Sequence, residues 1–93
     1  MIKRGKQGKD GHVKITFSLP AEEPPGPVSL VGDFNGWDPY SHPLTQRSNG
    51  HRSAVVTVPT STMLHFRYLG HDGVWFDDTD ADALHHDGGR LQV

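Results

Sequence analysis

The sequence predicts an all-β fold, and three observations carry the prediction. Apolar and polar residues alternate in short runs, which is the pattern of half-buried strands. Clusters of Gly, Pro, Asn and Asp separate the runs and provide the turns. No segment has helical periodicity. About seven short strands, about eight to twelve residues apart, predict a single β-sandwich domain.

The first two predicted strands have clear boundaries. In the run 13–19, the residues Val13, Ile15, Phe17 and Leu19 point to one face. Pro20 ends the strand, and a proline-rich loop at 21–27 follows. A second strand is predicted over 28–34. It ends in the turn-forming stretch 33–39, in which an Asn-Gly pair readily adopts positive φ.

The remaining strands follow at short intervals. A strand is expected at 43–47, a hairpin turn at Ser48-Asn49-Gly50, and a strand over 52–58 that Pro59 closes. The run 63–69 alternates again, with His65, Arg67 and Leu69 on the face opposite its aromatic residues. Residues 74–76 and a last edge strand at 90–93 complete the series.

Length and charge limit the function. Residues 1–11 are basic and Gly-rich and are expected to form a flexible tail, and 12–93 the sandwich. With net charge −2, the chain of 93 residues has no field that would attract nucleic acid. Because it lacks a long apolar run and a signal-peptide pattern, we expect no membrane partner and a cytoplasmic location.

Three residues are candidates for binding. Trp37 and Trp75 both lie beside turns, where a tryptophan is more often partly exposed than in mid-strand, and the apolar face of a sugar ring can lie flat on an indole. The alternative is that each caps one end of the core. Arg67 is expected to face solvent, where its planar fork can bond hydroxyls or serve as an ordinary surface charge.

Other chemistries have weaker support. His85 and His86 are adjacent, so on an extended chain they point apart and do not converge on a metal. The run that begins at Asp78 lacks the Gly and Glu of a calcium loop, so we expect a solvated acidic loop. No nucleophile elbow, phosphate loop or paired carboxylates in a pocket are found, which predicts no enzyme activity, no metal and no cofactor.

Read in order, several blocks resemble a known family. The stretch 28–37 reads V-S-L-V-G-D-F-N-G-W, and after a strand ending at Pro59 come F-R-Y-L at 66–69 and D-G-V-W at 72–75. This set resembles the isoamylase N-terminal (early set) domain, carbohydrate-binding module family 48. That family includes the glycogen-binding domain of the AMP-activated protein kinase β-subunit. Short stand-alone bacterial proteins are the most similar members.

The resemblance implies an immunoglobulin-like sandwich that binds α-1,4-glucan (glycogen, starch or maltodextrin) without catalysis. It assigns the stacking residues to Trp37 and Trp75, the basic contact to Arg67, and a further contact to Leu84. Where the family has Thr and Asn, this chain has Gly88 and Gly89, which predicts weaker binding. The alternative is a protein-interaction module that docks on a glycogen-metabolising enzyme, with sugar binding weak or lost.

Overall fold

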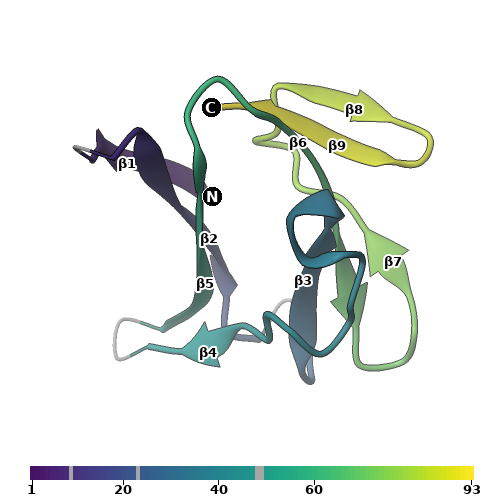
Figure 1. The fold of residues 1–93 in the computed structure, drawn as a ribbon. Coiled ribbons are helices and arrows are strands. Elements are labelled where there is room, and N and C mark those ends of the chain that lie inside the picture. Colours follow the sequence, from purple (N-terminus) through teal and green to yellow (C-terminus); the bar gives the residue numbers. More distant parts are fainter. Residues whose placement is uncertain (9, 23, 48–49) are drawn as a thin grey trace.

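The computed structural model confirms the all-β sandwich. It describes residues 1–8, 10–22, 24–47 and 50–93, and the hairpin turn expected at Ser48-Asn49-Gly50 falls partly on Ser48 and Asn49, outside them. Two antiparallel sheets pack face to face (Figure 1). The described residues form strands β1 (Ile2–Gln7), β2 (His12–Pro20), β3 (Val28–Gly32), β4 (Thr45–Gln46), β5 (His51–Pro59), β6 (Met63–Gly70), β7 (Trp75–Phe76), β8 (Ala83–His85) and β9 (Gly88–Gln92).

Each sheet has a simple order. The first sheet runs β1-β2-β5-β4, and its β2–β5 pair is continuous from His12↔Pro59 to Pro20↔His51. The second sheet runs β3-β6-β9-β8, and β7 also pairs with β6. Strand β6 therefore lies at the centre of the second sheet, between β3 on one side and β9 and β7 on the other. Among the described residues, no helix is long and apolar enough to cross a membrane.

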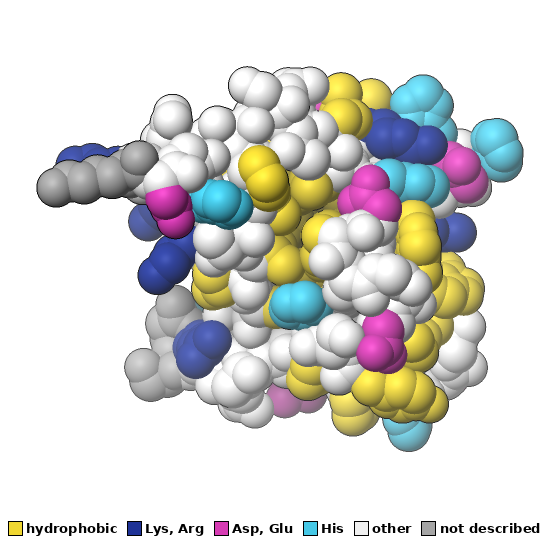
Figure 2. Space-filling model, in the orientation of Figure 1, with side chains coloured by type: hydrophobic (Ala, Val, Ile, Leu, Met, Phe, Trp, Pro, Cys, Tyr) yellow, Lys and Arg dark blue, Asp and Glu magenta, His cyan; other side chains and the backbone are white. Residues whose placement is uncertain are grey.

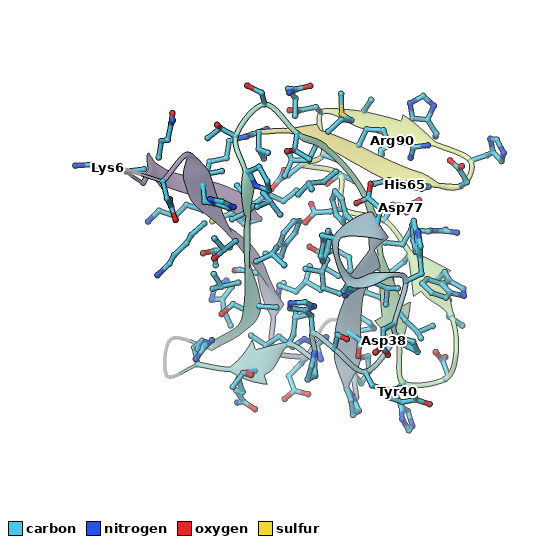
Figure 3. All side chains as sticks on the ribbon, in the orientation of Figure 1. Lys6, Asp38, Tyr40, His65, Asp77 and Arg90 are labelled. Atoms are coloured by element: carbon cyan, nitrogen blue, oxygen red, sulfur yellow. The ribbon has the colours of Figure 1, made fainter. Side chains whose placement is uncertain are left out.

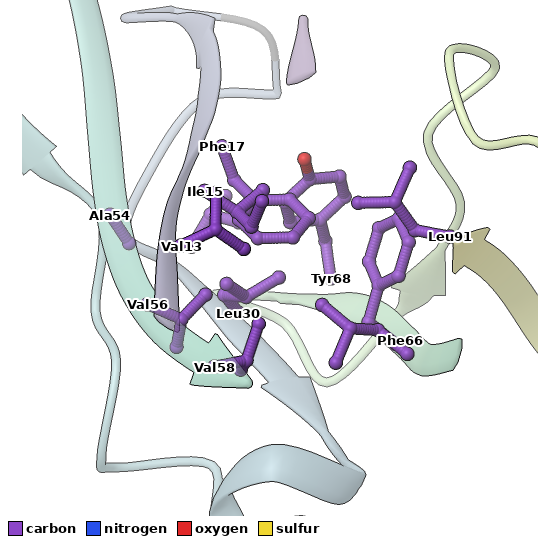
Figure 4. Close-up of a cluster of buried hydrophobic side chains, with 12 residues drawn as sticks. Val13, Ile15, Phe17, Leu30, Ala54, Val56, Val58, Phe66, Tyr68 and Leu91 are labelled. Carbon is purple, nitrogen blue, oxygen red and sulfur yellow. The ribbon is translucent and has the colours of Figure 1, made fainter. Parts of the chain in front are cut away.

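The core lies between the sheets and is filled by the alternating residues that the sequence indicated (Figure 4). Phe17 of β2 packs edge-on against Phe66 of β6, with ring centroids 5.0 Å apart. Such aromatic pairs stabilise the fold beyond their burial. The core cluster consists of Val13, Ile15, Phe17, Val28, Leu30, Ala54, Val56, Val58, Leu64, Phe66, Tyr68 and Leu91.

The beginning of the chain differs from the expected flexible tail. Residues 2–7 form strand β1, which pairs with β2 from Ile2↔Phe17 to Gln7↔Val13 through an irregular register. Arg4 ties this strand to the other sheet, since its guanidinium bonds the carboxylate of Asp82 at 2.9 Å and the backbone carbonyl of Gln92. The basic composition misled the prediction, because an edge strand can carry exposed charge on its outer face.

The end of the chain also differs from expectation. Strand β9 is internal and β8 is the edge, so the stretch expected to be an acidic loop contributes a strand. Asp78 is 5% exposed rather than solvated. It accepts a hydrogen bond of 2.7 Å from the hydroxyl of Tyr68. Burial, reinforced by this carboxylate, raises the pKa of Tyr68 well above its ordinary value. The hydroxyl therefore stays protonated and remains a donor to the buried carboxylate.

Candidate functional site

The outward face of β6 brings the predicted site residues together. Every second residue of β6 is buried in the core, so His65, Arg67 and Leu69 point away from it. Trp75 is the cross-strand partner of Leu69 and therefore lies on the same face. Trp37 reaches this face from the loop after β3, where its ring contacts that of His65. Trp37, Arg67 and Trp75 are called the platform below.

A tight turn presents Trp37. A 3₁₀ turn over Asp33–Asn35 follows β3, and the amide of Asn35 fixes it by accepting from the backbone N–H of Gly32 and donating to the carbonyl of Leu30. The second strand accordingly ends at Gly32, earlier than predicted. Trp37 itself has φ +60°, which is unusual for a bulky side chain and costs about 1–2 kcal/mol. Strain of this kind concentrates at functional sites.

His65 supports the ring of Trp37. The two ring centroids are 4.6 Å apart, with the planes at 77°, so the contact is edge-on. The Nε2 atom of His65 lies 2.7 Å from the backbone carbonyl of Asp87. Because a carbonyl only accepts, Nε2 carries the proton. Trp37 remains 38% exposed, as its place beside a turn predicted.

Arg67 lies between the two tryptophans along β6 and is held in place on one side. Its Nε donates to Oδ1 of Asp77 at 3.0 Å, and its Cζ lies 6.0 Å from the centroid of the Trp75 ring, at the outer limit of a cation–π contact. In the described part of the chain, no hydrogen bond occupies the terminal nitrogens of Arg67. The guanidinium is thus oriented, and four N–H donors remain for a ligand.

Trp75 forms the other half of the platform. It is 42% exposed, so the alternative in which both tryptophans cap the core does not describe their positions. Its neighbour Phe76 faces inward and stacks on Tyr68, with ring centroids 5.2 Å apart. The pair Trp75–Phe76 therefore anchors β7 through one ring and presents the other to solvent.

Gly88 allows the β8–β9 turn to approach the platform closely. A Cβ atom at this position would lie 2.8 Å from Cγ of Arg67 and 2.9 Å from Nε2 of His65. Its φ of +133° also favours glycine. Arg67 and His65 therefore occupy the space that a side chain at position 88 would need.

Leu84 is not brought to the platform. It pairs with Gly89, which in turn pairs with Phe66, so the register puts Leu84 on the inner face of the sheet. There it lies beyond the edge of the core and is 50% exposed. The sheet separates it from Arg67. The carbohydrate contact that the resemblance assigned to Leu84 has no geometric support.

Three neighbours of the platform were not singled out from the sequence. Two of them could have been found from spacing in the sequence. His65 alternates in step with Arg67 and therefore shares its face of the strand, and Asp77 follows Trp75 by two residues. Tyr40, which is 87% exposed on the loop after Trp37, had no such signal beyond the turn-forming residues around it. Figure 3 shows His65, Asp77 and Tyr40 on the side of the molecule opposite Lys6 of the basic strand β1. The described residues hold no group of three His, Asp or Glu side chains suited to a metal ion.

Comparison with known proteins relates the chain to enzymes of α-glucan metabolism. It matches no protein-family model. It is 43% identical over 47 residues to 1,4-alpha-glucan branching enzyme GlgB 2 of Xanthomonas campestris pv. campestris, and 41% identical over 49 residues to 1,4-alpha-glucan branching enzyme GlgB 1 of Rhizobium etli. Each match covers 50% of this chain but only 6% and 7% of the enzymes.

The similarity therefore extends over only part of this chain and a small part of each enzyme. Half of this chain is similar to the N-terminal region of the branching enzymes, and the chain spans a small fraction of their length. The fold and the surface define a class: a β-sandwich with two exposed tryptophans around an oriented arginine. The names of the relatives give α-glucan as the material on which those enzymes act.

Proposed function

We propose that this protein is a non-catalytic module that binds α-1,4-glucan chains across the platform. One observation supports this most directly: Trp37 and Trp75 are both about two-fifths exposed on the face where Arg67 lies between them. Two rigid apolar rings with a multiple hydrogen-bond donor between them suit a chain of pyranose rings, whose faces are apolar and whose edges carry hydroxyls.

The binding would proceed without large rearrangement. The indole rings lose little conformational entropy because each has only two χ angles, and Trp37 is already supported by His65. Asp77 fixes Arg67 through Nε, so its terminal N–H groups can donate to hydroxyls of the bound sugar. We expect stacking on such an open surface to be weak, with a Kd of about 0.1–1 mM, which corresponds to about 4–6 kcal/mol.

A titration of labelled protein with maltoheptaose tests the proposal. The indole N–H signals of Trp37 and Trp75 should both shift at millimolar sugar, whereas the β-linked cellohexaose should shift them less. Trp75→Ala should weaken the affinity about tenfold or more. Val55→Ala is the matched control, since Val55 is a 44% exposed apolar residue of the other sheet. Indole signals that stay in place throughout the titration would refute the proposal.

A second function, docking on a glycogen-metabolising enzyme, rests on the similarity to a small part of much longer branching enzymes. Recovery of one defined enzyme on the immobilised protein, unaffected by excess maltodextrin and lost with Trp75→Ala, would favour docking over sugar binding.

A further inference from the structure

Beside the platform lies a groove of about 400 Å³. Its lining includes Ser29, Pro39, Tyr40, Leu69 and His71. These residues come from β3, from the loop after Trp37 and from the end of β6, so three segments that are distant in sequence form one hollow. Hydrophobic side chains gather in Figure 2 on the side of the molecule where Figure 1 places β3 and β7.

The sheet register makes the groove continuous with the platform. Ser29 pairs with Leu69, and Leu69 pairs with Trp75, so the three form one row across β3, β6 and β7. Direct cross-strand neighbours lie about 5 Å apart, which is the scale of one sugar ring. A chain that leaves the indole of Trp75 therefore meets Leu69, in the floor of the groove, as its next contact.

Tyr40 stands at the rim of the groove on an ordered loop. It is 87% exposed, yet its backbone N–H donates to Oδ1 of Asp38 at 2.9 Å, and the hydroxyl of Ser41 donates to the other carboxylate oxygen, also at 2.9 Å. These two hydrogen bonds lower the pKa of Asp38, which keeps the carboxylate ionised as an acceptor. A large aromatic ring is thus exposed on a loop that Asp38 holds in shape.

The lining has the chemistry of a sugar site. Leu69 and Pro39 provide apolar area, Tyr40 provides a ring on which a pyranose can stack, and hydroxyl groups of Ser29 and Tyr40 provide partners for sugar hydroxyls. Among the described residues that line the groove, none is Lys or Arg, so a phosphate or a nucleic-acid backbone is not the matching ligand.

From this arrangement we infer that Tyr40 and the groove over Leu69 form an additional subsite for α-glucan, so that the protein favours chains long enough to cover both the platform and the groove. The inference rests on the proposed function. Short maltooligosaccharides occupy the platform, and longer ones add the contact with Tyr40. The loop that presents Trp37 at one end of β6 therefore presents Tyr40 at the other.

The test compares maltotriose with maltoheptaose on the wild type, Tyr40→Ala and the control Val55→Ala by calorimetric or NMR titration. Tyr40→Ala should weaken the affinity for maltoheptaose about three- to tenfold and leave that for maltotriose within twofold. Tyr40→Phe should retain most of the long-chain affinity, since it keeps the ring. Comparing variant with wild type for each sugar cancels the statistical advantage of a longer ligand.

The outcomes separate the two proposals. If the wild type binds both sugars but Tyr40→Ala weakens them equally, or weakens neither, the subsite is refuted while the platform stands. If the wild type binds neither sugar, both proposals fail. Because Tyr40 is almost fully exposed, its replacement should leave the amide spectrum of the remaining residues unchanged, which verifies that the fold is intact.

Discussion

Gly88 offers the sharpest test of how the platform is supported, because replacing it by alanine adds one methyl group at a crowded point. The new Cβ would meet Cγ of Arg67 at 2.8 Å, Nε2 of His65 at 2.9 Å and the carbonyl of Phe66 at 3.0 Å. The last of these is backbone and cannot rotate away. The backbone itself, at φ +133°, disfavours any side chain.

The cost has two parts. The unfavourable backbone conformation contributes about 1–2 kcal/mol, and the crowding contributes a further 1–3 kcal/mol or so. A total of about 3 kcal/mol in the free energy of unfolding corresponds to a fall in Tm of about 12 °C or more for a domain of this size. Because Arg67 and His65 are the side chains displaced, glucan affinity at low temperature should fall as well.

Gly11→Ala is the matched control. Gly11 also has positive φ, at +78°, but a Cβ there would have no atom within 4 Å, so only the backbone cost of about 1 kcal/mol applies. Calorimetric or fluorescence melts of the two variants and the wild type give the comparison. If Gly88→Ala melts no lower than Gly11→Ala, the close packing described around the platform is refuted.

Two further predictions concern carboxylates near the platform and at the sheet edge. Asp77→Asn should weaken maltoheptaose binding about threefold with little change in Tm, because Arg67 loses the charged acceptor that orients it; an unchanged Kd would contradict this role. The pKa of Asp82 is lowered, first by the hydrogen bond from the backbone N–H of Gln92 and then by Arg4. The ionised carboxylate of Asp82 therefore stabilises the fold above its unfolded-state pKa of about 4. This stabilisation is lost as the pH falls through the lower pKa that Asp82 has in the folded state. Asp82→Asn should thus lower the free energy of unfolding at pH 7 and reduce the loss of stability between about pH 5 and pH 2. Denaturation at several pH values measures both effects, and a pH profile that matches the wild type would contradict the prediction.

Much of the fold could be predicted from local pattern. Alternation at Val13, Ile15 and Phe17 identified β2 and its buried face, and the same pattern placed Arg67 on the outward face of β6. These predictions succeeded because the side-chain period of a strand is a local property. The strand at 2–7 could not be found in this way, since its residues are mostly exposed and its pairing with β2 is its main reason for being extended.

The candidate site was likewise predictable only in part. The turn residues beside Trp37 and Trp75 left two alternatives, an exposed ring or a cap on the core, and the structure shows both rings partly exposed. Leu84 was assigned by position in a family pattern, but the register of β8 with β9 puts it on the other side of the sheet from Arg67. Register inverts the facing of a residue with a shift of one position, and nothing local to Leu84 determines it.

By itself, the sequence determined that this chain is a β-sandwich with an outward-facing arginine and with two tryptophans beside turns, because alternation and turn chemistry act over a few residues. Whether the tryptophans are exposed or cap the core was left open by the sequence and decided by the structure. Tertiary structure alone decided which of these lie together. The pairing of β6 with β7 put Trp75 beside Leu69, the contact with His65 brought Trp37 to the same face, and the pairing of β3 with β6 joined the platform to the groove of Tyr40. Such neighbours are fixed by hydrogen bonding and packing between distant segments, which no local pattern records.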